Sequence, residues 1–383
     1  MLRKKAFYIF ILLTFFIIAS HNVSALDVSA KSAVVINAQT NEIVFEKNCN
    51  QKLSMASTTK IMTSLLACTS GRMNDIVTVV PDMLYGVEGT AIGLKPGYKM
   101  SLRNLVYGML LESGNDAAQT TAFYLGGSVS SFALKMNGLA KQVGMKNTNF
   151  VTPSGLDSEE HYTTAYDMAL LGAYAVKNPE FRSICSTKSI TVDFVEPQLR
   201  MTFSNHNRLL RSFDGAFGIK TGFTKKSGRC LVSAAERNGV CFVAVTLNAP
   251  NDWNDHKRML EYAFENVSEE SVDIGLSDRI CIEGAKEKFV SIRASENPVR
   301  ISYNGSKGDF SCKLFLPAFI YAPVSESEII GYAEIYKDDE LIKRVDIVST
   351  QKIECIEETY VPKKSILQRI KDKIRDLFDR QDN

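Results

Sequence analysis

Hydrophobic residues change their spacing along this chain, from every second residue to helical spacing and then back to every second residue. Two strand-like runs within residues 32–47 flank the polar turn Gln39-Thr40-Asn41 and predict a hairpin. The elements expected after it are a helix from about Thr58, a helix at 102–111 with Ser101 as its N-cap, a break at 113–115, a helix from Asp116, strands at 216–221, 230–235 and 240–247, and a helix at 255–264. Strands at both ends with helices between them predict an α/β (α+β) domain, a mixed sheet covered by helices.

The pattern changes again from about Asp273, where short alternating runs dominate. Residues 289–293 and 331–348 are examples, and the second run folds back at Asp338-Asp339. We therefore expect a first domain at residues 26–270 and a small all-β domain at residues 271–360.

The first 25 residues have the composition of an export signal. Arg3, Lys4 and Lys5 precede an apolar run at residues 6–19, and Val23-Ser24-Ala25 has the character of a cleavage site. Fourteen residues span about 21 Å as a helix, short of the roughly 30 Å hydrocarbon core of a bilayer. We expect residues 1–25 to be a cleaved signal peptide, with an uncleaved N-terminal anchor as the alternative.

The charge balance argues against nucleic acid as the main partner. The chain has 45 basic and 43 acidic residues, and removal of the signal peptide leaves 42 basic ones. A nearly neutral body lacks the basic surface that a phosphate backbone requires. The remaining histidines, His161, His206 and His256, lack metal-protease spacing, and no glycine-rich phosphate loop occurs. We expect no metal and no cofactor, and a structural role for His161.

Eight cysteines raise the question of disulfide bridges, because an exported chain can form them. Five cysteines lie before residue 250 and three after residue 280, so each region holds an odd number. Buried free thiols are therefore the favoured expectation, and one or two bridges remain the alternative.

The tail combines an apolar stripe with a basic face. Ile366, Leu367, Ile370, Ile374, Leu377 and Phe378 share one side of a helix, and residues 361–383 include seven basic and four acidic residues. This pattern is typical of a helix that lies in a membrane interface, so we expect residues 361–383 to associate with a membrane surface. Packing on the chain's own domain or on a partner is the alternative.

Three short motifs follow one another in the first domain: Ser57-Thr58-Thr59-Lys60, Ser113-Gly114-Asn115 and Lys220-Thr221-Gly222. Each motif alone is weak, since residues 349–352 match the first pattern and residues 295–297 the second. Only this trio places a Ser–Lys pair at a helix start, a Ser–Asn pair at a break between helices and a Lys-Thr-Gly run on a strand.

This placement suits serine acyl transfer. Residues three apart on a helix share a face, so Lys60 can reach the Ser57 hydroxyl. Backbone N–H groups in the first turn are unpaired and can bind a developing oxyanion. Lys60 acts as a base only when neutral, and lowering its pKa from about 10.4 to about 7 requires roughly 4–5 kcal/mol. Burial and the charge of Lys220 are the expected sources of that shift.

The other motif residues have matching tasks. Ser113 can relay a proton to a leaving amine, and Asn115 can position the lysine and the substrate amide. The strand that carries Lys220, Thr221 and Gly222 can pair with an extended peptide, and Gly222 leaves room for its approach. Singly, each residue has a structural explanation; together and in this order, they indicate catalysis.

The motifs resemble those of the penicillin-recognising serine acyl-transferases, and their surroundings resemble the low-molecular-weight D-alanyl-D-alanine carboxypeptidases. The segments that carry this likeness are residues 150–157 (FVTPSGLD), 161–169 (HYTTAYDMA), 205–210 (NHNRLL) and 218–224 (GIKTGFT). The resemblance is close over residues 27–270, and the β-domain and tail follow the same architecture. It implies a serine β-lactamase/transpeptidase-like fold for the first domain.

The resemblance also implies a role for each motif residue. Ser57 would be the nucleophile, Lys60 its base, Ser113 and Asn115 the relay and positioning groups, Lys220 and Thr221 the site of the substrate's terminal carboxylate, and the N–H groups of Ser57 and Phe223 the oxyanion hole. The substrate would be a peptidoglycan stem peptide ending in D-Ala-D-Ala, and β-lactams would acylate Ser57 as covalent inhibitors. The enzyme would act at the outer face of the cytoplasmic membrane or in the cell wall.

The chain departs from the family pattern at two places. Some members have a histidine where Ser154 stands, and many carry an arginine near the position of Asp252-Trp253. Three other functions share the motifs: a D-alanyl endopeptidase, a β-lactamase with a positioned carboxylate for fast deacylation, and a catalytically silent wall-binding scaffold. The intact motif set favours the carboxypeptidase.

Overall fold

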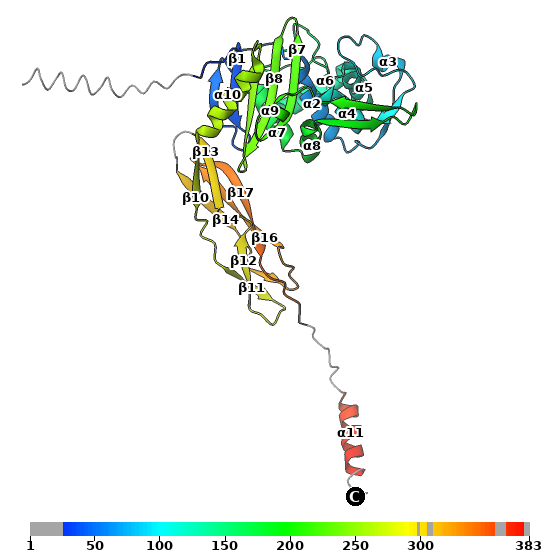
Figure 1. The fold of residues 1–383 in the computed structure, drawn as a ribbon. Helices are drawn as coiled ribbons and strands as arrows, with labels where there is room; N and C mark the ends of the chain where they lie inside the picture. Colours follow the sequence, from blue (N-terminus) through cyan, green and yellow to red (C-terminus); the bar gives the residue numbers. More distant parts are fainter. Residues whose placement is uncertain (1–25, 297–298, 305–308, 357–364, 379–383) are drawn as a thin grey trace, which may run out of the picture. The chain divides into compact units, whose positions relative to one another are not determined.

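The computed structural model describes residues 26–296, 299–304, 309–356 and 365–378. The expected signal peptide, residues 1–25, lies outside these ranges. The chain forms two compact units, and the main division between them falls between Glu270 and Ser271 (Figure 1).

An antiparallel five-stranded sheet forms the centre of the first unit (Figure 1). In spatial order its strands are β2 (Ile43–Lys47), β1 (Ser32–Asn37), β9 (Val240–Leu247), β8 (Gly228–Arg237) and β7 (Ala216–Thr224). All four neighbouring pairs are antiparallel, so the expectation of mixed strand directions is wrong in this detail. Short turns join β1 to β2, β7 to β8 and β8 to β9, and a short connection can only join antiparallel neighbours.

Helices cover this sheet, as the hydrophobic pattern predicts, and they do so on both faces. Successive residues of a strand point to opposite faces. Val34 and Ile36 pack into a core that includes residues of α2 (Lys60–Cys68) and α7 (Ala165–Val176). Ala33 and Val35 instead pack against α10 (Asp252–Glu265). The central strands β1 and β9 are therefore apolar on both sides.

The other elements of this unit are short helices and two-stranded ribbons. They are η1 (Ala56–Thr59), α3 (Pro81–Leu84), α4 (Leu102–Leu111), α5 (Asn115–Gly126), α6 (Val129–Val143), α8 (Pro179–Ser186) and α9 (Leu209–Ser212), with β3 (Ile76–Thr78) paired to β4 (Lys99–Ser101) and β5 (Ser189–Asp193) paired to β6 (Arg200–Ser204). The expected helix at 102–111 is confirmed as α4. The Ser101 hydroxyl accepts the Asn104 N–H at 3.2 Å, as an N-cap does.

The second unit is built of strands, which confirms the expected all-β character. Its sheet has the order β14 (Phe310–Phe315), β16 (Ile329–Lys337), β17 (Glu340–Ser349), β12 (Phe289–Ala294), β11 (Arg279–Glu283) and β15 (Phe319–Tyr321). The strands β10 (Val267–Val272) and β13 (Val299–Asn304) pair with each other, and each has residues on both sides of the division. The turn between β16 and β17 is confirmed, with φ of 49° at Asp338 and 67° at Asp339. Ile280, Ile282 and Val290 belong to a separate core.

All eight cysteines are free thiols, which confirms the favoured expectation over disulfide bridges. The five in the first unit are also buried. The expectation of burial is wrong for Cys281 and Cys355, which are exposed. Cys281 alternates with the buried residues Ile280 and Ile282 along β11, so its side chain points to the outer face of the sheet.

The last described element is α11 (Ile366–Phe378), which lies within the tail segment 361–383. Its residues Ile366, Leu367 and Ile370 are 78%, 73% and 50% exposed. Among the helices in the described ranges, none combines the length and apolar character needed to cross a bilayer.

Candidate active site

Ser57 and Lys60 lie one turn apart where η1 meets α2. Ala56 has a φ of 47°, an unusual backbone conformation for a residue with a Cβ, and Ser57 follows it directly. Ser57 is half-buried in the 3-10 turn η1, and Lys60 is the first residue of α2. The three-residue spacing brings the Lys60 Nζ to 2.9 Å from the Ser57 Oγ.

Lys60 is completely buried and its amine makes three contacts. Besides Ser57 Oγ, its Nζ lies 2.7 Å from Asn115 Oδ1 and 2.8 Å from the carbonyl oxygen of Ser154. The amide and backbone oxygens can only accept hydrogen bonds. A neutral amine has two N–H groups and one lone pair, so both N–H groups bind these oxygens and the lone pair faces Ser57. The contacts therefore suit Lys60 as a base for the Ser57 hydroxyl.

The environment favours the neutral amine. Burial is the main reason why the pKa of Lys60 is well below its ordinary value, and the positive charge of Lys220 lowers it further. The carboxylate of Asp116 acts in the opposite direction. Lys220 is also buried, which lowers its pKa to about 7.

The break between α4 and α5 holds the second motif. Ser113 is half-buried and has a φ of 62°, and Asn115 begins α5. The Asn115 Nδ2 donates to the carbonyl of Glu88 at 2.6 Å, which turns Oδ1 toward Lys60. The backbone carbonyl of Glu88 thus fixes the amide orientation, and no residue pattern in the sequence indicated it.

Strand β7 brings the third motif against η1, the turn that carries Ser57. A Cβ added to Gly222 would stand 3.1 Å from the backbone nitrogens of Ser57 and Thr58, so glycine permits this close approach. The Lys220 Nζ donates to the carbonyl of Thr221 at 2.8 Å. Phe223 follows with a side chain that is 65% exposed.

Asp116 is a buried residue of the site that sequence reasoning missed. Its carboxylate accepts the N–H groups of Ile92, Gly93 and Leu94 at 2.9–3.0 Å and that of Ala117 at 2.8 Å. It therefore ties the segment before β4 to the start of α5, where Asn115 lies. The only signal for it was its place directly after the Ser-Gly-Asn motif.

The two departures from the family pattern have structural explanations. Ser154 contributes its backbone carbonyl to Lys60, and any residue type can supply that group. Asp252 pairs with Arg229 at 2.9 Å, and the guanidinium groups of Arg208 and Arg229 lie 5.9 and 5.8 Å from the centre of the Trp253 ring. Two arginines from other elements thus stand beside the position where the sequence has none.

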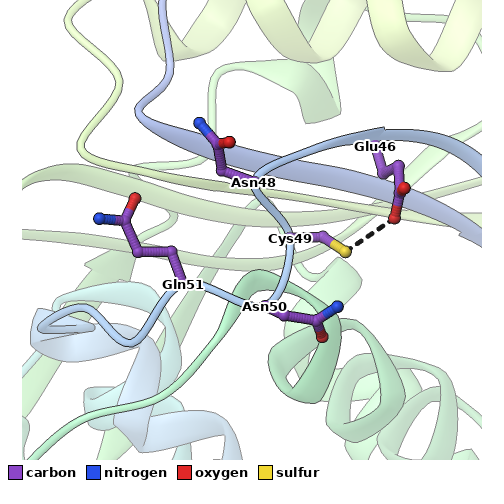
Figure 2. Close-up of a pocket in the computed structure, with 5 residues that line it drawn as sticks. All are labelled: Glu46, Asn48, Cys49, Asn50 and Gln51. Carbon is purple, nitrogen blue, oxygen red and sulfur yellow. Dashed lines mark hydrogen bonds between the residues drawn. The ribbon is translucent and has the colours of Figure 1, made fainter.

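A separate recess of about 520 Å³ follows β2 and is lined by Glu46, Asn48, Cys49, Asn50 and Gln51 (Figure 2). The Cys49 thiol donates a hydrogen bond to the Glu46 carboxylate at 2.9 Å. Burial and then the adjacent Glu46 raise the pKa of Cys49 to about 12, so the thiol stays protonated and is a poor nucleophile. In the described part of the chain, no group of His, Cys, Asp and Glu is arranged to hold a metal ion.

The structure thus places Lys60 in contact with both Ser57 and Asn115 and packs Gly222 against η1. Lys220 acts on Lys60 through its charge. Ser113 lies two residues before Asn115, and Thr221 lies between Lys220 and Gly222.

Comparison with known proteins places this arrangement in a family. Residues 19–251 match the family model described as D-alanyl-D-alanine carboxypeptidase, and residues 279–355 match the C-terminal domain of penicillin-binding protein 5. The D-alanyl-D-alanine carboxypeptidase DacF of Bacillus subtilis (strain 168) is 31% identical over 335 residues, which cover 84% of this chain and 85% of the relative.

Solved structures show the same likeness. Penicillin binding protein 5 from Haemophilus influenzae superimposes with a TM-score of 0.61 at 26% identity, over 86% of this chain and 98% of that chain. The Streptomyces K15 DD-transpeptidase has a TM-score of 0.60 at 30% identity, over 62% of this chain and 98% of that chain. The chain therefore belongs to the D-alanyl-D-alanine carboxypeptidase family.

Proposed function

We propose that this chain is a serine-type D-Ala-D-Ala carboxypeptidase that removes the terminal D-alanine from peptidoglycan stem pentapeptides through an acyl-enzyme on Ser57. The observation that carries the proposal is the set of contacts around Lys60. Two obligate acceptors take its N–H groups, and its third contact is the Ser57 hydroxyl at 2.9 Å. Loss of terminal D-alanine would limit cross-linking of the wall.

In the first half of the reaction, Ser57 Oγ attacks the carbonyl carbon of the penultimate D-alanine while Lys60 takes its proton. The backbone N–H groups of Ser57 and Phe223 would stabilise the oxyanion. Lys220 and Thr221 would bind the terminal carboxylate. The C–N bond then breaks, and Ser113 would relay the proton to the leaving amine of D-alanine.

In the second half, water attacks the ester carbonyl of the acyl-enzyme and gives up a proton to Lys60. The C–Oγ bond breaks, and Ser57 regains its hydrogen. Asn115 would hold both the amine of Lys60 and the substrate amide, and Gly222 would let the substrate backbone approach the strand edge.

A β-lactamase on this fold would need a carboxylate free to activate water. Asp116, the buried carboxylate whose charge acts on Lys60, accepts four backbone N–H groups instead. Asp116 is therefore not free to activate water, and we expect β-lactams to act as covalent inhibitors.

The test is the release of D-alanine from diacetyl-Lys-D-Ala-D-Ala. Wild-type protein is expected to release one D-alanine per tripeptide, and Ser57→Ala is expected to release none above background. Equal release by both proteins would refute the role of Ser57. Cleavage of internal D-alanyl bonds in cross-linked wall fragments, without release of terminal D-alanine, would indicate the endopeptidase.

We further propose that residues 1–25 direct export and that the tail holds the enzyme at the outer face of the cytoplasmic membrane. The exposed apolar side chains of Ile366, Leu367 and Ile370 and the basic bias of the tail support this proposal. Deletion of residues 362–383 is expected to move the protein from the membrane fraction to the soluble fraction. Retention at the membrane would show that another segment is the anchor.

A further inference from the structure

His161 is a buried residue that the proposed mechanism does not use. It is 2% exposed, and the ring of Phe150 packs against it edge-on with centroids 5.9 Å apart. Both ring nitrogens are engaged: Nε2 lies 2.8 Å from the Thr59 hydroxyl, and Nδ1 accepts the Val151 N–H at 2.9 Å. Thr59 belongs to η1, the turn that carries the proposed nucleophile Ser57 (the nucleophile turn). Val151 belongs to the loop that leads to Ser154.

The partners of His161 determine which nitrogen carries the proton. A backbone N–H can only donate, so Nδ1 is the unprotonated nitrogen. Nε2 therefore carries the hydrogen and donates it to Thr59 Oγ1. The Thr59 hydroxyl donates its own hydrogen to the carbonyl of Ala56 at 2.8 Å. Val151, His161, Thr59 and Ala56 thus form one directed chain of hydrogen bonds.

This chain of hydrogen bonds joins two segments that meet at the reaction site. Ala56 directly precedes Ser57, and the loop that begins at Val151 carries the Ser154 carbonyl bound to Lys60. The two segments are in close contact, because a Cβ on Gly155 would stand 1.8 Å from the Ala56 carbonyl oxygen. His161 connects them through side-chain hydrogen bonds.

We propose that His161 is a positioning residue for acyl transfer, which holds the Ser154 carbonyl and the nucleophile turn in the arrangement that points the Lys60 lone pair at Ser57. The inference rests on the proposed function. If the loop moved away, the Lys60 N–H bound to Ser154 would turn to another acceptor, and the lone pair would turn with it. A displacement of about 1 Å at such a site lowers the rate about 100-fold.

His161 is not itself the acid or base of the reaction. Its two nitrogens are committed to Thr59 and Val151. Burial lowers its pKa to about 4, so the ring is neutral at physiological pH and the chain of hydrogen bonds stays intact.

Three substitutions test separately the two hydrogen bonds of His161, to the Val151 N–H and to the Thr59 hydroxyl. His161→Asn keeps an acceptor near the position of Nδ1 for the Val151 N–H, and His161→Gln keeps a donor near the position of Nε2 for Thr59. His161→Leu removes both. His256→Asn is the matched control, because His256 is equally buried and its nitrogens bind the hydroxyls of Ser233 and Thr246, in the layer of α10.

The readout is acylation by a labelled penicillin, with the acylation rate at saturation measured apart from the apparent dissociation constant, and Tm measured for each variant. His161→Leu is expected to lower the saturating rate about 100-fold with the dissociation constant changed only a few-fold. His161→Asn and His161→Gln are expected to recover part of that rate. His256→Asn is expected to lower Tm while the saturating rate stays near wild type.

A folded His161→Leu variant with the wild-type rate would overturn the inference, and so would an equal loss of rate in His256→Asn. If His161→Leu does not fold, Thr59→Val takes its place, because it breaks the same link at Thr59; an unchanged rate there overturns the inference too. Wild-type protein that is not acylated and releases no D-alanine would refute the proposed function instead.

Discussion

The amine of Lys60 has three neighbours, and only one distribution of its two hydrogens and its lone pair satisfies them all when it is neutral. Asn115 and Ser154 contribute oxygens that can only accept, so the lone pair faces the hydroxyl of Ser57. The Ser–Lys spacing predicted the contact between Lys60 and Ser57. The orientation of the lone pair depends on groups far away in the sequence.

The positive charge of Lys220 makes the pH dependence of acylation testable. As the proposed base, Lys60 must be neutral to react, so the acylation rate is expected to rise with pH through its pKa. Lys220→Gln removes a like charge that lowers the pKa of Lys60, so that pKa rises and the acidic limb moves to higher pH. The measurement is the pH profile of penicillin acylation for the wild type and for Lys220→Gln. An acidic limb that stays in place, or moves to lower pH, contradicts this account of Lys60.

At the scale of elements, the contact between the loop at 151–155 and η1 requires glycine. Gly155 has a φ of 88°, and a Cβ there would lie 1.8 Å from the Ala56 carbonyl oxygen. Gly155→Ala is therefore expected to lower Tm by several degrees and to reduce penicillin acylation at least tenfold, because the loop must move away from the nucleophile turn.

Gly138→Ala is the matched control for that substitution. Gly138 lies inside α6, and apart from its chain neighbours and the backbone of its own helix no atom lies within 4 Å of an added Cβ. Alanine at a helix interior position is about 1 kcal/mol more favourable than glycine, so Tm should rise slightly and acylation should stay unchanged. Equal losses in the two variants would show that the contact at Gly155 has no special role.

The sequence predicted the elements that have a clear hydrophobic period and the residues that have a motif. The β1–β2 hairpin, helix α4 with its Ser101 cap and the turn at Asp338-Asp339 are examples. It did not predict the carbonyls of Glu88 and Ser154, because every residue has a carbonyl and only the path of the loop decides where it points. The uniformly antiparallel sheet was not predicted, because the hydrophobic alternation of a strand is the same in parallel and antiparallel sheets.

At the scale of the whole molecule, the two units have separate cores. The clusters around α7 and α10 draw their residues from the first unit, and the cluster around Ile280 and Val290 draws them from the second. Because the cores of the two units share no residues, the first unit is expected to fold and to react without the β-unit.

A protein truncated to residues 26–270 is thus expected to fold and to be acylated by penicillin within a few-fold of the full-length rate. The measurement compares saturating acylation rates and Tm for the two lengths of chain. A truncated protein that folds but reacts more than about 100-fold more slowly would show that the β-unit contributes to the catalytic site. A loss of that size is what a displacement of the reacting groups by about 1 Å causes.

The most direct test of the central claim is mass spectrometry of the intact protein and its peptides after incubation with a labelled penicillin. We predict the addition of one penicilloyl group per chain, located on Ser57, and no addition in Ser57→Ala. Labelling of any other residue, or wild-type protein that remains unmodified, would contradict the assignment of Ser57 as a nucleophile activated by neutral Lys60.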